Sequence, residues 1–204
     1  MNFEKLLSKK YICLYAGDIP SLEMYKKFIG LSICKSDEHH IKHNIENRYP
    51  IKSNCVHIYQ AEDVLEHIEM EKLPAIINEI YRILKTKGVF RLSLPDYQCD
   101  VLCKRSIKDE KGRIIFDPGG GGDFVNGRVI GGGHLWFPKF EEVKKLLHKT
   151  LFKKIRFYHY YDTTGYGVIN PINYEIGVVR RTPDFDSRVQ NPRRPLSIVV
   201  DCTK

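Results

Sequence analysis

The chain has 204 residues, of which 42% are hydrophobic and 28% are charged, and its formal net charge is +8 at pH 7. This length suits one α/β domain, and the composition is that of a globular protein rather than a disordered or fibrous one. No apolar run approaches the roughly 20 residues that span a bilayer, and the first residues lack the apolar core of a signal peptide. We therefore expect a single cytoplasmic domain over residues 1–204.

The cysteine spacing argues against disulfides and structural zinc, and the positive charge favours an anionic partner. Six cysteines are scattered through the chain without a C-x-x-C pair, so we expect free thiols rather than disulfides or structural zinc. The excess of lysine and arginine favours an anionic partner, such as a nucleic acid or a nucleotide-linked sugar. Because these residues are dispersed and no RNA-binding signature is present, nucleic acid is the less favoured partner.

The first part of the chain alternates strand and helix patterns. An apolar run at residues 10–15 predicts a buried strand that ends in a turn at Gly17. The elements expected next, in chain order, are a helix at 21–28, a strand at 29–33, a polar loop at 35–54 and a strand at 55–60.

The firmest pattern covers residues 70–94. Apolar residues from Leu73 to Leu84 recur at helical spacing, and the lysines that follow suit a helix C-terminus, with Gly88 expected in the left-handed cap. Residues 89–94 predict a strand that Pro95 stops. A strand, a helix and a strand in this order form a βαβ crossover, which implies a parallel sheet.

The second part of the chain begins with a glycine-rich loop at residues 117–133. An amphipathic helix is expected from Phe140, on the spacing of its apolar residues. Strands are expected at 152–160 and 196–202, with a further candidate at 174–179.

The segment from Asp63 to Asp96 carries a family resemblance. Its residues Leu65-Glu66-His67, then Glu79, Arg82, Leu84, Lys85 and Gly88, and finally Pro95-Asp96 are in the order and spacing of a known motif set. In these residues the chain resembles the class I S-adenosylmethionine (SAM)-dependent methyltransferases. The resemblance implies a Rossmann-like α/β domain, with a mostly parallel sheet and an antiparallel C-terminal strand, and SAM as the cofactor.

The resemblance also implies where SAM would contact the first strands. The family usually has several glycines after the first strand, where this chain has Tyr15-Ala16-Gly17-Asp18. The usual acidic residue for the ribose falls at Ser32, beside Ile33, and the adenine loop falls near Asn44 and Ile45. Serine lacks the charge-assisted hydrogen bond of a carboxylate, so these changes predict modest SAM affinity and leave room for an inactive member.

In this fold the ligand lies outside the carboxyl ends of the strands. By resemblance, Ala61, Glu62 and Asp63 would approach the cofactor, while Asp96 and Tyr97 would face the acceptor.

The glycine-rich segment at 117–138 is expected to be a substrate lid. It lacks the lysine and hydroxyl residue of a phosphate-binding loop, and its glycines would permit closure over the site. Asp123 and Trp136 are the expected substrate contacts within it. A plain surface loop is the alternative interpretation.

Methyl transfer to a hydroxyl needs a general base. His134 is the first candidate, because a neutral imidazole is available near pH 7, and Asp96 is the second. No metal site is expected: His39, His40 and His43 lie near Glu38 in a polar loop without the usual ligand pattern.

A looser resemblance, carried by the Gly-Gly-His-Leu-Trp-Phe-Pro segment at 132–138, is to methyltransferases of surface-glycan clusters in bacteria and large algal viruses. It implies O-methylation of a sugar hydroxyl, with a carbohydrate or glycan acceptor. A methyltransferase acting on RNA, protein or a small metabolite is one alternative. An inactive fold that binds a partner through a basic face is another.

Overall fold

The computed structural model describes all residues from Met1 to Lys204. Eight strands form one sheet in the order β11-β10-β12-β5-β4-β1-β2-β3, and two short hairpins stand apart from it. The strands of the sheet are β1 (Cys13–Ala16), β2 (Ile29–Ser32), β3 (His40–Lys42), β4 (Val56–Glu62), β5 (Leu84–Pro95), β10 (Lys154–Tyr161), β11 (Gly167–Ile169) and β12 (Ser197–Thr203).

The strand directions match the expected architecture. Strands β3, β2, β1, β4 and β5 pair in parallel, and β12 lies antiparallel between β5 and β10. The prediction of one mostly parallel α/β sheet with an antiparallel C-terminal strand is confirmed. The strands expected at 10–15, 29–33, 55–60, 89–94, 152–160 and 196–202 are present with shifted ends.

Helices cover one face of this sheet. The helix α2 (Leu73–Ile83) buries its apolar stripe there beside α4 (Phe140–His148), and both join the main hydrophobic core. The remaining helices are α1 (Phe3–Leu7) and α3 (Asp100–Arg105), with 3-10 turns at Glu23–Tyr25, Leu65–His67, Met70–Lys72, Pro118–Gly120 and Ser187–Val189. None of the helices has the length and hydropathy needed to cross a membrane.

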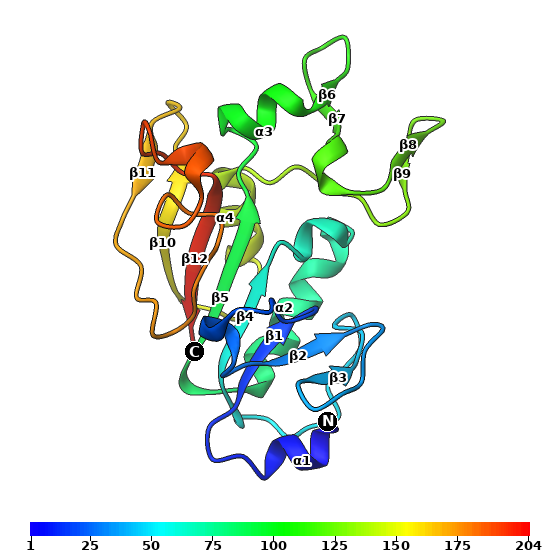
Figure 1. Cartoon of the computed structure of the whole chain (residues 1–204), viewed down its shortest axis with the longest axis vertical. Helices are drawn as coiled ribbons and strands as arrows, with labels where there is room; N and C mark the ends of the chain where they lie inside the picture. Colours follow the sequence, from blue (N-terminus) through cyan, green and yellow to red (C-terminus); the bar gives the residue numbers. More distant parts are fainter.

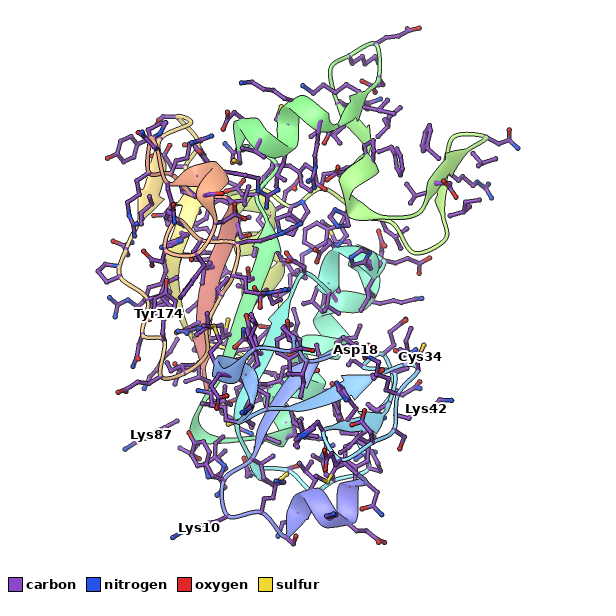
Figure 2. The ribbon with its side chains drawn as sticks, in the orientation of Figure 1. Lys10, Asp18, Cys34, Lys42, Lys87 and Tyr174 are labelled. Carbon is purple, nitrogen blue, oxygen red and sulfur yellow. The ribbon has the colours of Figure 1, made fainter.

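Irregular chain covers the other face. Val178 and the neighbouring Ile176 pack there on Tyr15 of β1 and Ile58 of β4. The segment is fastened by Arg91 of β5, whose fully buried guanidinium donates to the carbonyls of Asn173 and Gly177. Arg91 also forms a two-point ion pair with Asp201 of β12, at 2.8 and 2.7 Å. A buried arginine is stable only when its donors are satisfied in this way. In Figure 2, Tyr174 of this segment lies beside the sheet.

Three local predictions were wrong. The helix expected at 21–28 is only the turn Glu23–Tyr25, because tertiary contacts fix the chain there: the Tyr25 hydroxyl donates to Glu62, and the Ile19 N–H donates to Nε2 of His40. The loop expected at 35–54 contains β3. The strand expected at 174–179 is irregular, because side chains take its carbonyls in place of a neighbouring strand: Arg91 donates to Gly177, and Gln60 and Tyr25 donate to Val178.

The end of α2 also differs from the expected cap. The helix stops at Ile83 and passes directly into β5, and Lys87, not Gly88, has the left-handed backbone conformation. Gly88 is required for space, since a Cβ there would lie 2.8 Å from the Lys85 carbonyl oxygen.

Two hairpins project beyond the carboxyl ends of the central strands (Figure 1). They are β6 (Ile107–Lys108) with β7 (Ile114–Phe116), and β8 (Asp123–Val125) with β9 (Arg128–Ile130). The carboxyl edge of the sheet therefore carries most of the extra chain, which makes it the place to look for a site.

Candidate functional site

The carboxyl ends of β1, β2 and β3 form a shallow rim, which we call the β1–β3 rim and define by Asp18, Ser32, Ile33 and Asn44. In Figure 2, Asp18 and Cys34 mark this rim, whereas Lys10 and Lys87 mark the opposite edge. Gly17 turns the chain at the end of β1 with φ +88°, a conformation that favours glycine. Its nearest neighbour at the Cβ position would be Val64, at 3.7 Å, so the backbone is open to close approach there.

Polar groups on the β1–β3 rim are satisfied by their own neighbours. The Ser32 hydroxyl accepts hydrogen bonds from the backbone N–H groups of Cys34 and Lys35, at 3.1 and 2.9 Å. The Lys35 ammonium pairs with Asp18 at 2.6 Å. Ile33, by contrast, leaves 69% of its surface exposed, which is unusual for an isoleucine. The rim thus offers an apolar surface beside an ion pair.

The third strand end adds Asn44, which is exposed and accepts the Glu46 N–H. Its neighbour Ile45 is buried in the main core. Ala16 and Ala61 are fully buried strand residues, whose side chains pack in the core. Of the predicted cofactor contacts, therefore, Asp18, Ile33 and Asn44 present side chains to the surface.

Glu62, at the end of β4, is buried under the covering segment. Its carboxylate accepts the Tyr25 hydroxyl at 2.7 Å, the Tyr15 hydroxyl at 3.3 Å and the backbone N–H of Arg180 at 2.7 Å. Burial raises the pKa of Glu62 above its usual range, although these donors oppose the shift. Tyr15 and Glu62 consequently lie together, beneath the surface of the edge.

Asp63 continues from Glu62 in a left-handed conformation, with φ +55°. Its carboxylate pairs with Arg181 at 3.1 Å. Arg180, next in sequence, is exposed, so two guanidinium groups border the end of β4. These cations can bind a carboxylate or a phosphate.

Asp96, at the end of β5, is fully buried and holds two strand ends together. Its two oxygens accept the backbone N–H groups of Gln98 and Tyr161, at 3.0 and 2.8 Å. Burial raises the pKa of Asp96 to about 6. Both oxygens are already engaged, which leaves little capacity to take a proton from a substrate.

The next residue, Tyr97, begins a buried polar cluster, which we define as Glu66, His67, Tyr97, Asp117 and His134. The Tyr97 hydroxyl donates to Asp117 at 2.5 Å and also contacts Nδ1 of His134. Asp117 is held in turn by a 2.6 Å ion pair with Arg105. Burial acts to raise the pKa of Asp117, but the hydrogen bonds from Arg105 and Tyr97 outweigh it, so this pKa lies below its usual range.

His134 is 3% exposed, and its Nε2 lies 3.7 Å from Glu66. Burial, with a smaller contribution from His67, lowers the pKa of His134 to about 4. The imidazole is therefore neutral near pH 7. It does not cap α4, whose N-cap residue is Lys139.

Glu66 and His67 were noted in the sequence only as part of a family motif, and no chemical role was predicted for them. Both carboxylate oxygens of Glu66 are buried without a hydrogen-bond partner, and burial raises the pKa of Glu66 well above its usual range. His67 donates from Nδ1 to the carbonyl of Gly132, at 2.8 Å. No sequence signal points to this cluster, because residues 66 and 67 meet residue 134 only in the folded chain and the spacing between them does not show it.

The glycine-rich segment closes over this cluster at one end and projects at the other. Its final part is fixed on the 3-10 turn at Leu65–His67, since Leu135 N–H donates to the Glu66 carbonyl and the Trp136 indole donates to the Leu65 carbonyl. A Cβ on Gly120 would lie 2.7 Å from the His134 ring, so glycine is needed there for packing. Asp123 is exposed on the β8–β9 hairpin, away from Trp136, which is buried in the core.

A cavity of about 490 Å³ opens beside the buried polar cluster. Its lining brings together Tyr97 and Trp136, two of the predicted substrate contacts. The cavity also has a third aromatic ring and three cationic side chains, contributed by Phe137, Lys108, Arg113 and Lys139. Another cavity, of about 390 Å³, lies at the amino ends of β2 and β3, next to Phe28 and His40.

The cysteines are free as expected, whereas the histidines that lie together are not the ones considered in the sequence. All six cysteines are free thiols, as expected, and four of them are buried. The histidines at 39, 40 and 43 do not gather: His40 bonds Asp37, and His43 packs on Tyr49. The carboxylate and histidines that do gather are Glu66, His67 and His134.

The fold was compared with known protein families and with solved structures. No protein-family model matches the chain, and no curated protein matches it by sequence. A SAM-dependent methyltransferase from Archaeoglobus fulgidus superposes with a TM-score of 0.57, over 99% of this chain and 90% of that one, at 14% identity. The chain has the class I SAM-dependent methyltransferase fold.

Two further solved structures of this fold agree. A SAM-dependent methyltransferase from Thermotoga maritima, described as a possible histamine N-methyltransferase, has a TM-score of 0.54 at 16% identity, over 98% of this chain and 86% of that one. One from Mesorhizobium loti has a TM-score of 0.52 at 11% identity, over 95% and 90%. At these identities the methyltransferase fold is what is shared.

Proposed function

We propose that the protein is a SAM-dependent methyltransferase that transfers a methyl group to a sugar hydroxyl of a glycan or glycan precursor. The observation that carries the proposal is the buried polar cluster at the carboxyl edge of a methyltransferase fold. It sets a neutral imidazole, His134, beside the strand ends at which ligands of open α/β sheets bind.

The β1–β3 rim is the proposed SAM site. The exposed face of Ile33 suits the adenine or ribose, and Gly17 permits close approach of the backbone to the methionine part. Arg180, which is exposed and lies 3.7 Å from Glu62, borders the end of β4, where its guanidinium can pair with the carboxylate of SAM. Ser32 supplies no charge to the ribose, which is consistent with modest affinity.

His134 is the proposed general base. Methyl transfer from a sulfonium is an in-line displacement, and the enzyme chiefly aligns the acceptor oxygen and removes its proton. We prefer His134 to Asp96, because both oxygens of Asp96 already accept backbone N–H groups. Tyr97 and Asp117 fix the ring of His134 from its Nδ1 side.

The 490 Å³ cavity is the proposed acceptor site. Aromatic rings such as Tyr97 and Trp136 pack on the apolar faces of sugars, and the cations Lys108, Arg113 and Lys139 suit the phosphates of a nucleotide-linked sugar.

The test is a methyl-transfer assay with isotopically labelled SAM. The full chain is incubated with nucleotide-linked sugars and with oligosaccharides, and the products are analysed by mass spectrometry. A labelled methyl group on the sugar is expected. A labelled methyl group on RNA, protein or a small amine instead would refute the sugar acceptor but would still demonstrate methyltransferase activity.

A non-catalytic binding protein is the second candidate. The observation that favours it is the Ser32 hydroxyl, which stands where the family usually has a carboxylate and is used by its own backbone. A folded chain that turns over no SAM with any of these acceptor classes would favour this alternative.

A further inference from the structure

Three side chains of the buried polar cluster converge on one point. Glu66 and His67 lie on the turn after β4, and His134 lies in the segment before α4. One ligand atom from each lies within 4.8 Å of the others. Nε2 of His134 is 3.7 Å from the Glu66 carboxylate, and the two imidazole centroids are 4.7 Å apart.

The hydrogen bonds assign which imidazole nitrogens carry protons. Nδ1 of His67 faces the Gly132 carbonyl at 2.8 Å, so it must donate. Nδ1 of His134 faces the Tyr97 hydroxyl, which gives its own proton to Asp117. His134 therefore donates from Nδ1 as well. In the neutral state, both imidazoles then keep the lone pair on Nε2.

Glu66 adds a third acceptor to these two. It is fully buried, and neither carboxylate oxygen has a hydrogen-bond donor. The nearby cations do not supply one, because Arg105 is paired with Asp117 at 2.6 Å and Arg181 with Asp63 at 3.1 Å. A buried carboxylate without donors is strongly unfavourable unless it gains a proton or a cation.

We propose that Glu66, His67 and His134 bind one divalent first-row metal ion, for which Zn²⁺ is the best match. Two imidazoles and one carboxylate form a common catalytic zinc ligand set, which leaves a position for a water or hydroxyl oxygen. Ligand atoms on tetrahedral zinc lie roughly 3.3 Å apart, so these side chains close by about an ångström on binding.

The contacts behind the ligands support this assignment. Histidines that bind metals usually donate their other N–H to a carbonyl or an acidic partner. His67 does so to Gly132, and His134 does so through Tyr97 to Asp117. His67 is only half-buried, so an ion can enter from its side.

Metal binding does not depend on the proposed methyl transfer. Its consequence for catalysis does rest on that proposal: with Nε2 of His134 on the ion, the acceptor oxygen takes the open position. The charge of the ion would then favour loss of the hydroxyl proton to water, which reaches the site from the half-buried side of His67. His134 would serve as a ligand in this state, and as a base in the metal-free chain.

The test is titration of the chelator-treated full chain, without SAM. Zn²⁺ binding is followed by calorimetry and by the fluorescence of Trp136, the single tryptophan, which adjoins the site. Co²⁺ reports the ligand geometry through its visible absorption. We expect a single ion per chain, with the affinity reduced at least about 100-fold in His67→Ala and in Glu66→Gln.

His39→Ala is the matched control, because that exposed imidazole pairs only with Glu38. It should bind Zn²⁺ as the wild type does. Absence of Zn²⁺ binding by the folded wild type would overturn the proposal, as would unchanged binding in folded His67→Ala. If the wild type binds no Zn²⁺, Glu66 is protonated instead, and Glu66→Gln should then have the same unfolding free energy as the wild type. The methylation assay is a separate readout, so failure of one proposal leaves the other testable.

Discussion

The two halves of the sheet's carboxyl edge satisfy their polar groups in different ways. On the β1–β3 rim, the buried hydroxyl of Ser32 accepts backbone N–H groups two and three residues further on, and the half-exposed carboxylate of Asp18 pairs with Lys35. In the buried polar cluster, Tyr97, Asp117 and His134 come from separate segments, and Glu66 has no donor at all. The rim is the proposed SAM surface, whereas the cluster holds the groups that we propose to take a proton or to bind an ion.

The largest expected effect follows removal of the proposed base. His134→Ala should lower the rate of methyl transfer by about 100-fold or more, the usual contribution of a general base, while SAM affinity stays the same. Single-turnover kinetics and SAM calorimetry on the same variant measure both. An active variant would end the assignment of His134, because either of its proposed roles needs Nε2.

The carboxylate behind that histidine should matter chiefly for stability. Asp117→Ala leaves Arg105 and Tyr97 without their buried partner, so we expect a loss of about 3 kcal/mol in the free energy of unfolding. Asp123→Ala, an exposed acid on the neighbouring hairpin, should change that free energy by less than about 0.5 kcal/mol. If urea unfolding gives the same loss of free energy for both variants, the buried contacts of Asp117 contribute no more to stability than the exposed Asp123 does.

Asp96 gives a pH test on the same half of the edge. Its pKa in the folded chain, about 6, lies above the value of an unfolded aspartate. The stability that it contributes is therefore fully present below about pH 4 and is lost as the pH rises through about 6. Asp96→Asn should gain about 2 kcal/mol of unfolding free energy relative to the wild type between pH 4 and pH 7. A difference that is constant with pH would show that Asp96 is ionised throughout.

The smallest expected effect is on the rim. Ser32→Asp places a carboxylate where the ribose hydroxyls are expected, and a charge-assisted hydrogen bond there should tighten SAM binding by about tenfold. Asn44→Asp, at the exposed third strand end, is the comparison variant. If Ser32→Asp binds SAM no better than the wild type, the ribose does not lie at this strand end.

The sequence predicted the sheet well, because its strands are apolar runs bounded by glycine and proline, and α2 has a clear helical period. It failed where tertiary contacts decide. The irregular chain at 172–182 depends on the buried Arg91, and the turn at Glu23–Tyr25 is held by the hydrogen bond from the Tyr25 hydroxyl to Glu62.

The sequence places several of the predicted cofactor residues at strand ends, but it does not show which side chains meet beside them. The residues at 17, 32 and 63 fall at strand ends, as the family pattern implies, and His134 was singled out for its residue type. The convergence of Glu66, His67 and His134 joins positions 67 residues apart or more, and it depends on how the glycine-rich segment folds back. No local sequence pattern predicts that contact.

Calorimetry of SAM binding to the wild-type chain tests the central claim most directly. A methyltransferase with its cofactor on the β1–β3 rim should bind a single SAM per chain, with a dissociation constant below the millimolar range. A folded protein that gives no binding heat at millimolar SAM would contradict the account.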